Sequence, residues 1–319
     1  MNNELSGLRL IPGNSNPRLW DEIAANLHLP LTPVVVKRFA DGEIQVQIEE
    51  SVRDDYCVVL QSTCDPVNDH LMELLLLIDA LRRASAGRIG VVTPYYGYAR
   101  QDKKLQPREP ISARVVADLI ERVGAQRFLA MDLHSNSIQG FFNIPVDHLT
   151  AANLLCDQIR EDGWAAPDCV VVSPDVGGVE RASYVANELR LPIAIIAKRR
   201  PEPNACEVVE VVGDVRGRRA VMVDDMVDTA GSTTRGGNYL VKEGGATGVR
   251  VYAAHGVFGG NAAANINKSV IELVTVTNTI PPRVGIESNK IRYISAADLI
   301  GRAVYLNFTG GSVSSLFRR

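Results

Sequence analysis

The stretch Val221-Met222-Val223-Asp224-Asp225-Met226-Val227-Asp228-Thr229-Ala230-Gly231-Ser232-Thr233-Thr234 contains the strongest signal for the fold of this chain. Its three leading apolar residues are typical of a buried parallel strand, and we expect the strand to end at the acidic pair. The small, hydroxyl-rich segment 228–234 then leads into a helix expected over 236–243. Backbone N–H groups in such a turn, with the positive end of the helix, attract an anion. The stretch therefore predicts a phosphate site; the simpler alternative is a strand end followed by a helix N-cap.

Asp224 and Asp225 narrow the choice of ligand. Two carboxylates repel a nearby anion unless they face sugar hydroxyls or a divalent cation. A phosphorylated sugar with a metal ion nearby satisfies both groups, so this is the ligand that the stretch favours.

Length and composition set the outer limits. The 319 residues leave room for two ordinary domains, and 46% hydrophobic with 22% charged residues is typical of a globular protein. A net charge of −3 gives no basic footprint for a nucleic acid. The N-terminus lacks the blocks of a signal peptide and the apolar runs are too short to span a membrane, so we expect a cytoplasmic protein. The five scattered cysteines are expected to be reduced, mostly buried thiols.

Strands and helices alternate along the chain. The patterns predict strands at 8–13, 34–39, 56–60, 89–94, 127–131, 169–172, 193–197, 207–212, 249–254, 272–277 and 291–295, and helices at 17–27, 68–84, 111–123, 151–161 and 179–189. The alternation restarts near residue 150, which favours two doubly wound α/β domains with parallel sheets, 1–150 and 151–300. The serine-rich end of the tail, 310–317, has the composition of a frayed terminus.

Two further segments carry polar chemistry. Arg38-Phe39-Ala40-Asp41-Gly42-Glu43, followed by alternating apolar residues, predicts a β-hairpin, and Asp41 and Glu43 could simply serve its turn. Segment 100–110 holds Arg100, Lys103, Lys104 and Arg108 but almost no apolar residues, so it predicts a mobile loop. Such a loop is either a solvated surface or a lid over a polyphosphate.

Asp132-Leu133-His134 follows the strand expected at 127–131. A carboxylate and an imidazole two residues apart at a strand end could share the water shell of a metal ion or contact a phosphate. The alternative is a structural histidine. A glycine-rich turn, Ser173-Pro174-Asp175-Val176-Gly177-Gly178, follows the strand at 169–172.

Six motifs occur in the order found in one known family: 38–43, 94–102, 132–142, 173–175, 198–200 and 223–232. On these motifs the chain resembles the ribose-phosphate diphosphokinases, the phosphoribosyl pyrophosphate synthetases, over essentially its whole length. The resemblance implies two similar domains of the type I phosphoribosyltransferase kind, a tail (301–319) that packs back on the first domain, and a homohexamer built from dimers. It also implies Mg²⁺-dependent transfer of a diphosphoryl group from ATP to ribose 5-phosphate.

The resemblance implies a role for each matching residue. The ribose 5-phosphate site would comprise Asp224, Asp225, Asp228, Thr229, Ala230, Gly231 and Ser232, and ATP would contact Phe39, Asp41, Glu43, Arg100 and Gln101. The hairpin residues would serve the site of a neighbouring copy. Catalysis would involve Lys198, Arg200, His134, Lys103 and Lys104, and a metal ion would lie near His134, Asp175 and Asp132.

A regulatory site for phosphate and ADP is implied at Ser51, Arg53, Ser85, Arg108, Ser312 and Ser314. The chain departs from the family pattern there: Pro107 replaces a usual Ser and Ser315 a usual Tyr, so we expect altered, weakened activation by phosphate. Ser232 stands where Thr is usual and keeps the hydroxyl, whereas Asn143 replaces an Asp that is common in the family.

Two other functions fit part of the pattern. A phosphoribosyltransferase uses the same acidic pair and hydroxyl loop, but the basic loop and the Asp132–His134 motif argue against it. A non-catalytic regulatory paralogue would be expected to have lost Lys103, His134, Lys198 or Arg200, and all four are present.

Overall fold

The computed structural model describes residues 3–199, 208–283, 285–286 and 288–317, without the side chains of residues 3, 198, 199, 208 and 209. The chain divides into two compact units. Unit 1 comprises Met1–Leu149, Thr279–Pro281 and Ser295–Arg319, and unit 2 comprises Thr150–Asn278 and Pro282–Ile294. The C-terminal segment of unit 1 begins at Ser295, whereas the sequence placed the end of the second domain at residue 300. Unit 1 also includes the short segment Thr279–Pro281.

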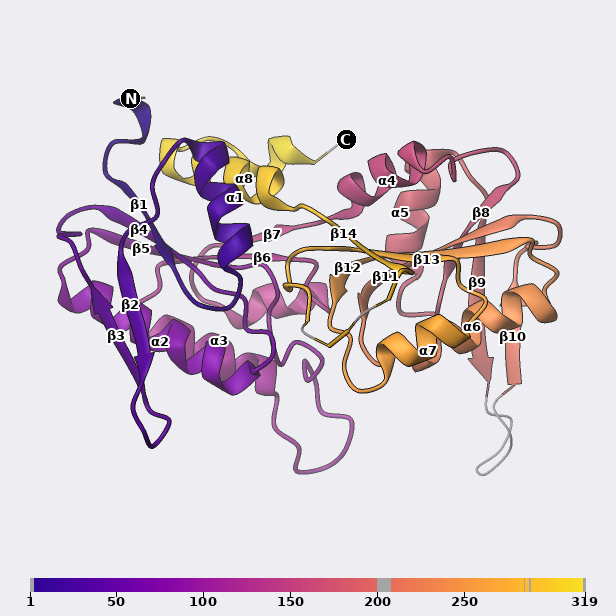
Figure 1. The fold of residues 1–319 in the computed structure, drawn as a ribbon, viewed down its shortest axis with the longest axis horizontal. Helices are drawn as coiled ribbons and strands as arrows, with labels where there is room; N and C mark the ends of the chain where they lie inside the picture. The colour runs from indigo at the N-terminus through magenta and orange to yellow at the C-terminus, as the bar shows by residue number, and fades with distance from the viewer. Residues whose placement is uncertain (1–2, 200–207, 284, 287, 318–319) are drawn as a thin grey trace. The chain divides into compact units, whose positions relative to one another are not determined.

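Unit 1 is built on a five-stranded parallel sheet with strand order β1-β4-β5-β6-β7. The strands are β1 (Leu8–Pro12), β4 (Tyr56–Leu60), β5 (Arg88–Thr93), β6 (Arg127–Met131) and β7 (Val146–Leu149). Helices α2 (Val67–Arg83) and α3 (Ser112–Val123) cover one face, and α1 (Pro17–Leu27) and α8 (Ala297–Thr309) the other (Figure 1). The sheet is buried on both faces, as its apolar strands predict.

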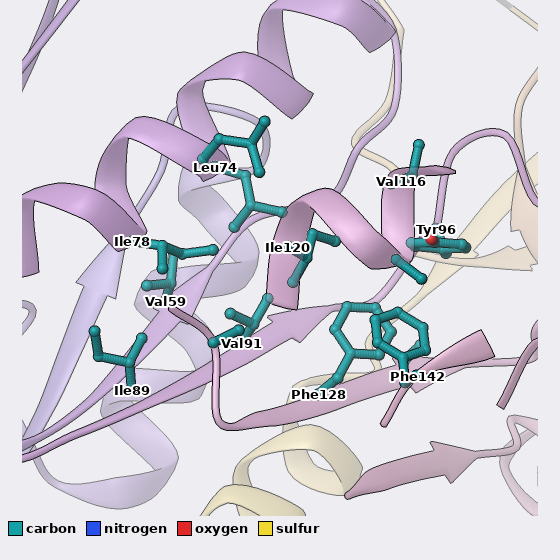
Figure 2. Close-up of a cluster of buried hydrophobic side chains, with 14 of the residues drawn as sticks. Val59, Leu74, Ile78, Ile89, Val91, Tyr96, Val116, Ile120, Phe128 and Phe142 are labelled. Carbon is teal, nitrogen blue, oxygen red and sulfur yellow. The ribbon is translucent and has the colours of Figure 1, made fainter. Parts of the chain in front are cut away.

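The core of unit 1 lies between the sheet and helices α2 and α3 (Figure 2). Phe128 of β6 stacks on Phe142 with ring centroids 4.4 Å apart, and Tyr96 meets Phe128 edge-on at 5.5 Å. The Tyr96 hydroxyl donates to the carbonyl of Ala113 at 2.8 Å, so this buried aromatic ring keeps its polar end satisfied. The aromatic cluster thereby fixes the start of the segment that follows β5.

The C-terminal segment is folded. Helix α8 buries Ala297, Ile300, Gly301, Ala303 and Val304, and it packs against α1. Gly301 lies at this contact, but a Cβ there would be 3.9 Å from the carbonyl oxygen of Ile23, an ordinary van der Waals distance, so the packing does not require a glycine. The end of the tail forms a short 3₁₀ helix, Val313–Leu316, so the expectation of a frayed terminus over 310–317 was wrong.

The predicted hairpin is confirmed. Strands β2 (Val34–Arg38) and β3 (Ile44–Ile48) pair antiparallel, with Arg38 opposite Ile44. Their inward-facing valines and isoleucines pack against the core beside α2.

Unit 2 contains a seven-stranded sheet with order β10-β9-β8-β11-β12-β13-β14. Its strands are β8 (Cys169–Ser173), β9 (Ile193–Arg199), β10 (Val208–Val212), β11 (Arg219–Val227), β12 (Gly248–Gly256), β13 (Leu273–Thr277) and β14 (Ile291–Ile294), and only β10 runs antiparallel to its neighbour. Helices α4 (Ala152–Glu161) and α5 (Val179–Leu189) lie on one face, and α6 (Gly231–Lys242) and α7 (Ala262–Lys268) on the other (Figure 1).

The α/β class with parallel sheets is therefore confirmed. The two units differ in one respect that the sequence did not predict: the strand order reverses between β8 and β11 in unit 2, whereas it does not reverse in unit 1. In open α/β sheets ligands bind at such a reversal, because the adjoining loops leave it in opposite directions.

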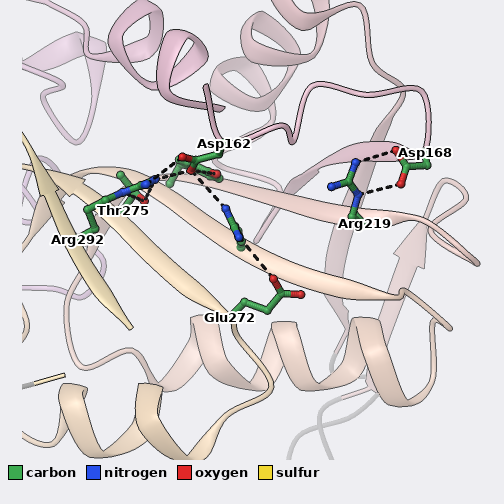
Figure 3. Close-up of polar contacts among 8 residues, drawn as sticks. Asp162, Asp168, Arg219, Glu272, Thr275 and Arg292 are labelled. Atoms are coloured by element: carbon green, nitrogen blue, oxygen red, sulfur yellow. Dashed lines mark hydrogen bonds and ion pairs between the residues drawn. The ribbon is translucent and has the colours of Figure 1, made fainter. Parts of the chain in front are cut away.

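An ionic network ties the end of α4 to the sheet of unit 2 (Figure 3). The Arg292 guanidinium binds both carboxylate oxygens of Asp162, with Nη1 to Oδ1 at 2.9 Å, and also donates to Thr275. Tyr252 and Gln158 donate to the same carboxylate at 2.7 and 3.0 Å. Although burial acts in the opposite direction, these hydrogen bonds hold the pKa of Asp162 below its usual value. Asp162 is thus a buried, fully engaged carboxylate.

Two compositional expectations can be compared with the structure. Cys57, Cys64, Cys156 and Cys169 are buried free thiols, as expected, and Cys206 lies outside the described residues. Within the described ranges, no helix is long and apolar enough to cross a membrane.

Candidate active site

The predicted phosphate loop connects β11 to α6 in unit 2. Strand β11 continues to Val227 and α6 begins at Gly231, so the expected strand end at Asp224 and helix start at 236 were both wrong. Ala230 adopts a left-handed conformation (φ 57°) as the N-cap, and Thr234 donates both its N–H and its hydroxyl to the Ala230 carbonyl. Gly231 and Ser232 therefore lie in the first turn of α6, whose N–H groups have no acceptor within the helix. This is the geometry of an anion site at a helix N-terminus.

Two contacts far apart in sequence hold this loop. Asn265 of α7 donates to the carbonyl of Thr229 at 2.9 Å. Gly259 lies beside Asp228, because a Cβ at this glycine would be 2.7 Å from Asp228 Oδ1. Neither residue was singled out from the sequence, since the pairing of β11 with β12 brings both of them to the loop.

The acidic pair lies inside the last part of β11. Asp224 Oδ1 accepts the N–H of Asp225 at 2.9 Å, and Arg181 Nη1 of α5 lies 3.8 Å from the same oxygen. Burial, and then the negative charge of Asp225, raise the pKa of Asp224 well above its usual value, while Arg181 lowers it. The ionised form of Asp224 is therefore less favourable in the folded protein than in water, although its side chain is still 23% exposed.

The Asp224→Asn variant is expected to be more stable than the wild type at pH 7, by on the order of 1 kcal/mol. The native state with its raised Asp224 pKa binds a proton more readily than the unfolded chain, so the wild type gains stability as the pH falls toward the ordinary aspartate pKa. Urea unfolding at pH 7 and pH 5 measures this, and the gap between variant and wild type should narrow at pH 5. A variant that is less stable at pH 7 would contradict this account of Asp224.

The Asp175 turn follows β8, the strand next to β11. Asp175 Oδ1 accepts the N–H of Gly178 at 2.9 Å, and Ser173 donates its hydroxyl to the Asp175 carbonyl at 2.7 Å. Strands β8 and β11 run parallel, with Cys169 opposite Arg219. Their carboxyl ends lie at the point where the strand order reverses, so the Asp175 turn and the phosphate loop leave adjacent strands at the binding edge of the sheet.

The predicted catalytic cations of unit 2 are only partly described. Lys198 lies on β9, where it pairs with Val209 of β10, but its side chain is outside the described residues. Arg200 lies wholly outside the described residues.

In unit 1 the hairpin turn presents the three predicted ATP contacts to solvent. The N–H of Phe39 donates to the Glu43 carbonyl at 2.9 Å, and Asp41 Oδ1 accepts the N–H of Glu43 at 3.1 Å. Gly42 takes the positive φ of 96° that this turn requires. Phe39 is 53% exposed despite its size, which a purely structural turn does not need. Asp41 therefore has a structural role in the turn, and Phe39 is the residue available for binding.

The basic segment after β5 forms no helix or strand over residues 94–111. It is anchored at both ends: the N–H of Gly97 donates to Thr63 Oγ1 at 2.6 Å, and that of Ala113 donates to the Gln101 carbonyl at 3.2 Å. Between these anchors the candidate lid residues Arg100, Gln101, Lys103, Lys104 and Arg108 are all exposed. A long exposed loop with fixed ends is compatible with a lid.

Asp132 and His134 follow β6. Asp132 is buried and has φ 39°, whereas His134 is exposed. The N–H of Leu133 donates to Nε2 of His148 at 2.9 Å, so the imidazole of β7 fixes the backbone between the two candidate residues. His148 was not singled out from the sequence, because only the pairing of β6 with β7 brings it here.

Sequence comparisons agree with these observations. Residues 8–124 match the N-terminal domain of ribose phosphate pyrophosphokinase, and residues 200–318 match the phosphoribosyl synthetase-associated domain. The ribose-phosphate pyrophosphokinase of Aquifex aeolicus is 49% identical over 313 residues, which cover 98% of this chain and 100% of that relative. The chain belongs to the ribose-phosphate pyrophosphokinase family. The relative from Clostridium perfringens is 47% identical over the full length of both chains.

The fold agrees with that of a solved pyrophosphokinase. The crystal structure of phosphoribosylpyrophosphate synthetase from Mycobacterium smegmatis aligns with a TM-score of 0.90 at 43% identity, covering 95% of this chain and 99% of that one. The predicted family and the prediction of an enzyme are therefore confirmed, and the two alternative functions lose their support.

A pyrophosphokinase needs a metal ion, so the predicted ligands matter. In the part of the chain that the structure describes, no three His, Cys, Asp or Glu residues form a group that could hold a metal. Mg²⁺ does not require one, because it commonly keeps several waters and binds through one or two carboxylates together with substrate phosphates. Asp175 uses only Oδ1 in its turn, and this fits such a partial site. Asn143 instead donates its amide to Glu121 Oε2 at 2.9 Å.

The regulatory residues expected in this pyrophosphokinase lie on several segments of unit 1. Arg53 and Ala86 form an antiparallel bridge, and the N–H of Asp54 donates to the Ser85 carbonyl at 3.0 Å, so the segments of Arg53 and Ser85 are neighbours. The hydroxyls of Ser312 and Ser314 are 2.6 Å apart, and Ser315 donates its hydroxyl back to Ser312. Ser51, Arg108 and Pro107 are exposed.

Proposed function

We propose that the chain transfers the β,γ-diphosphoryl group of ATP to the anomeric hydroxyl of ribose 5-phosphate, giving phosphoribosyl pyrophosphate and AMP. The observation that carries this proposal is the anion loop at the start of α6 with the acidic pair Asp224 and Asp225 before it on β11, at the strand reversal of unit 2. The loop suits the 5-phosphate, and the acidic pair suits the ribose hydroxyls.

On the acceptor side, the residues from Asp228 to Ser232 hold the 5-phosphate through backbone N–H groups and hydroxyls. Asp224 and Asp225 accept hydrogen bonds from the ribose hydroxyls. This binding orients the anomeric oxygen for attack, and holding it in place supplies much of the rate by removing the entropy cost of the encounter.

On the donor side, Arg100 and Gln101 bind ATP, and Lys103 and Lys104 close over its phosphates as part of the lid. Phe39 stacks on the adenine, with Asp41 and Glu43 beside it, and this hairpin serves a neighbouring copy in a homohexamer of dimers. The exposure of Phe39 supports the proposal, since a stacking residue must be accessible.

During the transfer the anomeric oxygen forms a bond to the β-phosphorus and the bond from this phosphorus to the α-phosphate oxygen breaks, so AMP leaves. Lys198, Arg200 and His134 stabilise negative charge on the transferring group. Asp132, His134 and Asp175, together with the substrate phosphates, would hold Mg²⁺, which would neutralise charge on the phosphate oxygens.

We further propose a cytoplasmic enzyme whose activation by phosphate is weakened. Ser51, Arg53, Ser85, Arg108, Ser312 and Ser314 would bind the activator, and Pro107 and Ser315 remove two of its usual contacts. The Ser315 hydroxyl supports this proposal, because it donates to the carbonyl of Ser312 within the tail.

Calorimetric titration with ribose 5-phosphate tests the acceptor assignment. The Asp224→Asn variant should raise Kd at least tenfold, since a hydrogen bond to a charged group contributes roughly 1.5–3 kcal/mol. Asp214→Asn is the matched control, because Asp214 is an exposed turn residue that accepts the N–H of Arg216. Equal affinity of the Asp224→Asn variant and the wild type would refute the assignment.

A further inference from the structure

The hairpin β2–β3 runs along α2 (Figure 1). The residues lining a cavity of about 290 Å³ in unit 1 include members of both elements. Val36 and Ile44 form its apolar wall, and Asn14, Lys37, Arg38, His70 and Glu73 supply polar groups. The volume is at the lower end of the range for small-molecule sites. None of these residues has a role in the proposed reaction.

The acidic group of the cavity is already occupied by protein. Glu73 is only 3% exposed, and its Oε1 accepts the N–H of Asn14 at 2.6 Å. Burial raises the pKa of Glu73, although the hydrogen bond from Asn14 and the nearby His70 and Arg38 lower it. Glu73, which also forms a hydrogen bond with the Gln61 side chain, therefore holds the floor of the cavity in place.

The basic groups, in contrast, keep capacity for a ligand. His70 Nδ1 lies 2.9 Å from the carbonyl of Cys64, and a carbonyl only accepts, so Nδ1 carries the proton and Nε2 is left for another partner. Arg38 Nη2 pairs with Asp69 at 2.9 Å, but both side chains are more than 40% exposed, which makes this ion pair weak and exchangeable. A guanidinium has five N–H donors, and one contact leaves most of them open.

We propose that this cavity binds a compact phosphorylated ligand, up to the size of a nucleoside monophosphate. Its phosphate contacts Arg38 with Lys37 nearby, its polar body reaches His70 Nε2, and its apolar side lies on Val36 and Ile44. Because Arg38 directly precedes Phe39, an occupant would also restrain the tip of the hairpin.

The imidazole signals of isotope-labelled histidines test this proposal, because the chain has only five histidines and His134 reports separately on the candidate active site. Inorganic phosphate, ribose 5-phosphate and AMP are titrated in turn, with ribose as the neutral control. We expect a saturable shift of the His70 signal with at least one phosphorylated probe and none with ribose.

Two variants are expected to change the His70 response to the phosphorylated probe in opposite directions. Arg38→Gln should weaken the His70 response at least tenfold, whereas Asp69→Asn, which frees Arg38, should strengthen it; Arg18→Gln on α1, with its side chain 83% exposed, is the control. An unfolded variant cannot bind more tightly, so the Asp69→Asn arm is independent of folding defects. A shift confined to His134, or an equal His70 response in Arg38→Gln, would overturn the proposal.

Discussion

Replacement of Lys198 by alanine is expected to lower kcat by about 10²–10³-fold, the loss seen when one charge-stabilising group is removed from a transition state. The affinity for ribose 5-phosphate should stay within about threefold, because the acceptor contacts lie on the loop between β11 and α6 and not on β9. Single-turnover kinetics with saturating ATP, together with calorimetric titration of ribose 5-phosphate, measure both quantities.

Lys242→Ala is the control for this experiment, since Lys242 is an exposed lysine at the end of α6. It should keep the wild-type kcat. If Lys198→Ala turned over within tenfold of the wild type, or lost ribose 5-phosphate binding in parallel with turnover, Lys198 would not be the charge-stabilising group.

The Asp162→Ala variant is expected to lose about 3 kcal/mol of unfolding free energy. It leaves Arg292, Tyr252 and Gln158 without their shared acceptor, and breaking a buried ion pair costs roughly 3–5 kcal/mol. The lower figure applies because the Arg292 side chain is 34% exposed. Asp168→Ala is the matched control: Asp168 also binds an arginine, Arg219, through both oxygens, but its side chain is 57% exposed, so the loss should be much smaller than that of Asp162→Ala.

The stability lost in Asp162→Ala is also expected to depend on pH. The folded-state pKa of Asp162 lies below its unfolded value, so its contribution is present above about pH 4 and is lost as the pH falls through the folded pKa. Urea unfolding at pH 7 and below pH 4 should show the difference between wild type and Asp162→Ala shrinking at low pH. Equal losses in the Asp162 and Asp168 variants at pH 7 would show that burial of the network contributes nothing.

The sequence predicted most of the strands and helices because each is encoded locally. The apolar run Val221 to Val223 is buried in β11, and the Asp-Gly turn between alternating residues does form the hairpin. The ends of elements were less predictable. Strand β11 continues through the acidic pair because Asp224 and Met226 still pair with β12, and α6 starts early because Ala230 takes the capping conformation. The extension of β11 and the early start of α6 both depend on contacts with residues far away in sequence, which a local sequence pattern cannot predict.

The same reasoning explains which site residues the sequence revealed. The loop from Asp228 to Ser232 is contiguous in sequence, so its residue pattern alone predicted an anion site. The family resemblance supplied residue roles that spacing could not predict. Arg181, His148 and Asn265 were missed, because each reaches its partner only through a strand pairing or a helix contact far away in sequence. From the sequence, Asp41 was either a residue of the hairpin turn or an ATP contact. It accepts the N–H of Glu43, so it does have a structural role in the turn.

The phosphorus NMR spectrum of the products tests the proposed reaction most directly. Pure protein is incubated with ATP, Mg²⁺ and ribose 5-phosphate, and the proposed transfer predicts equal amounts of AMP and a new diphosphate attached to an anomeric carbon. Omission of ribose 5-phosphate should abolish both signals. Formation of ADP, or no turnover with or without added phosphate, would contradict the account.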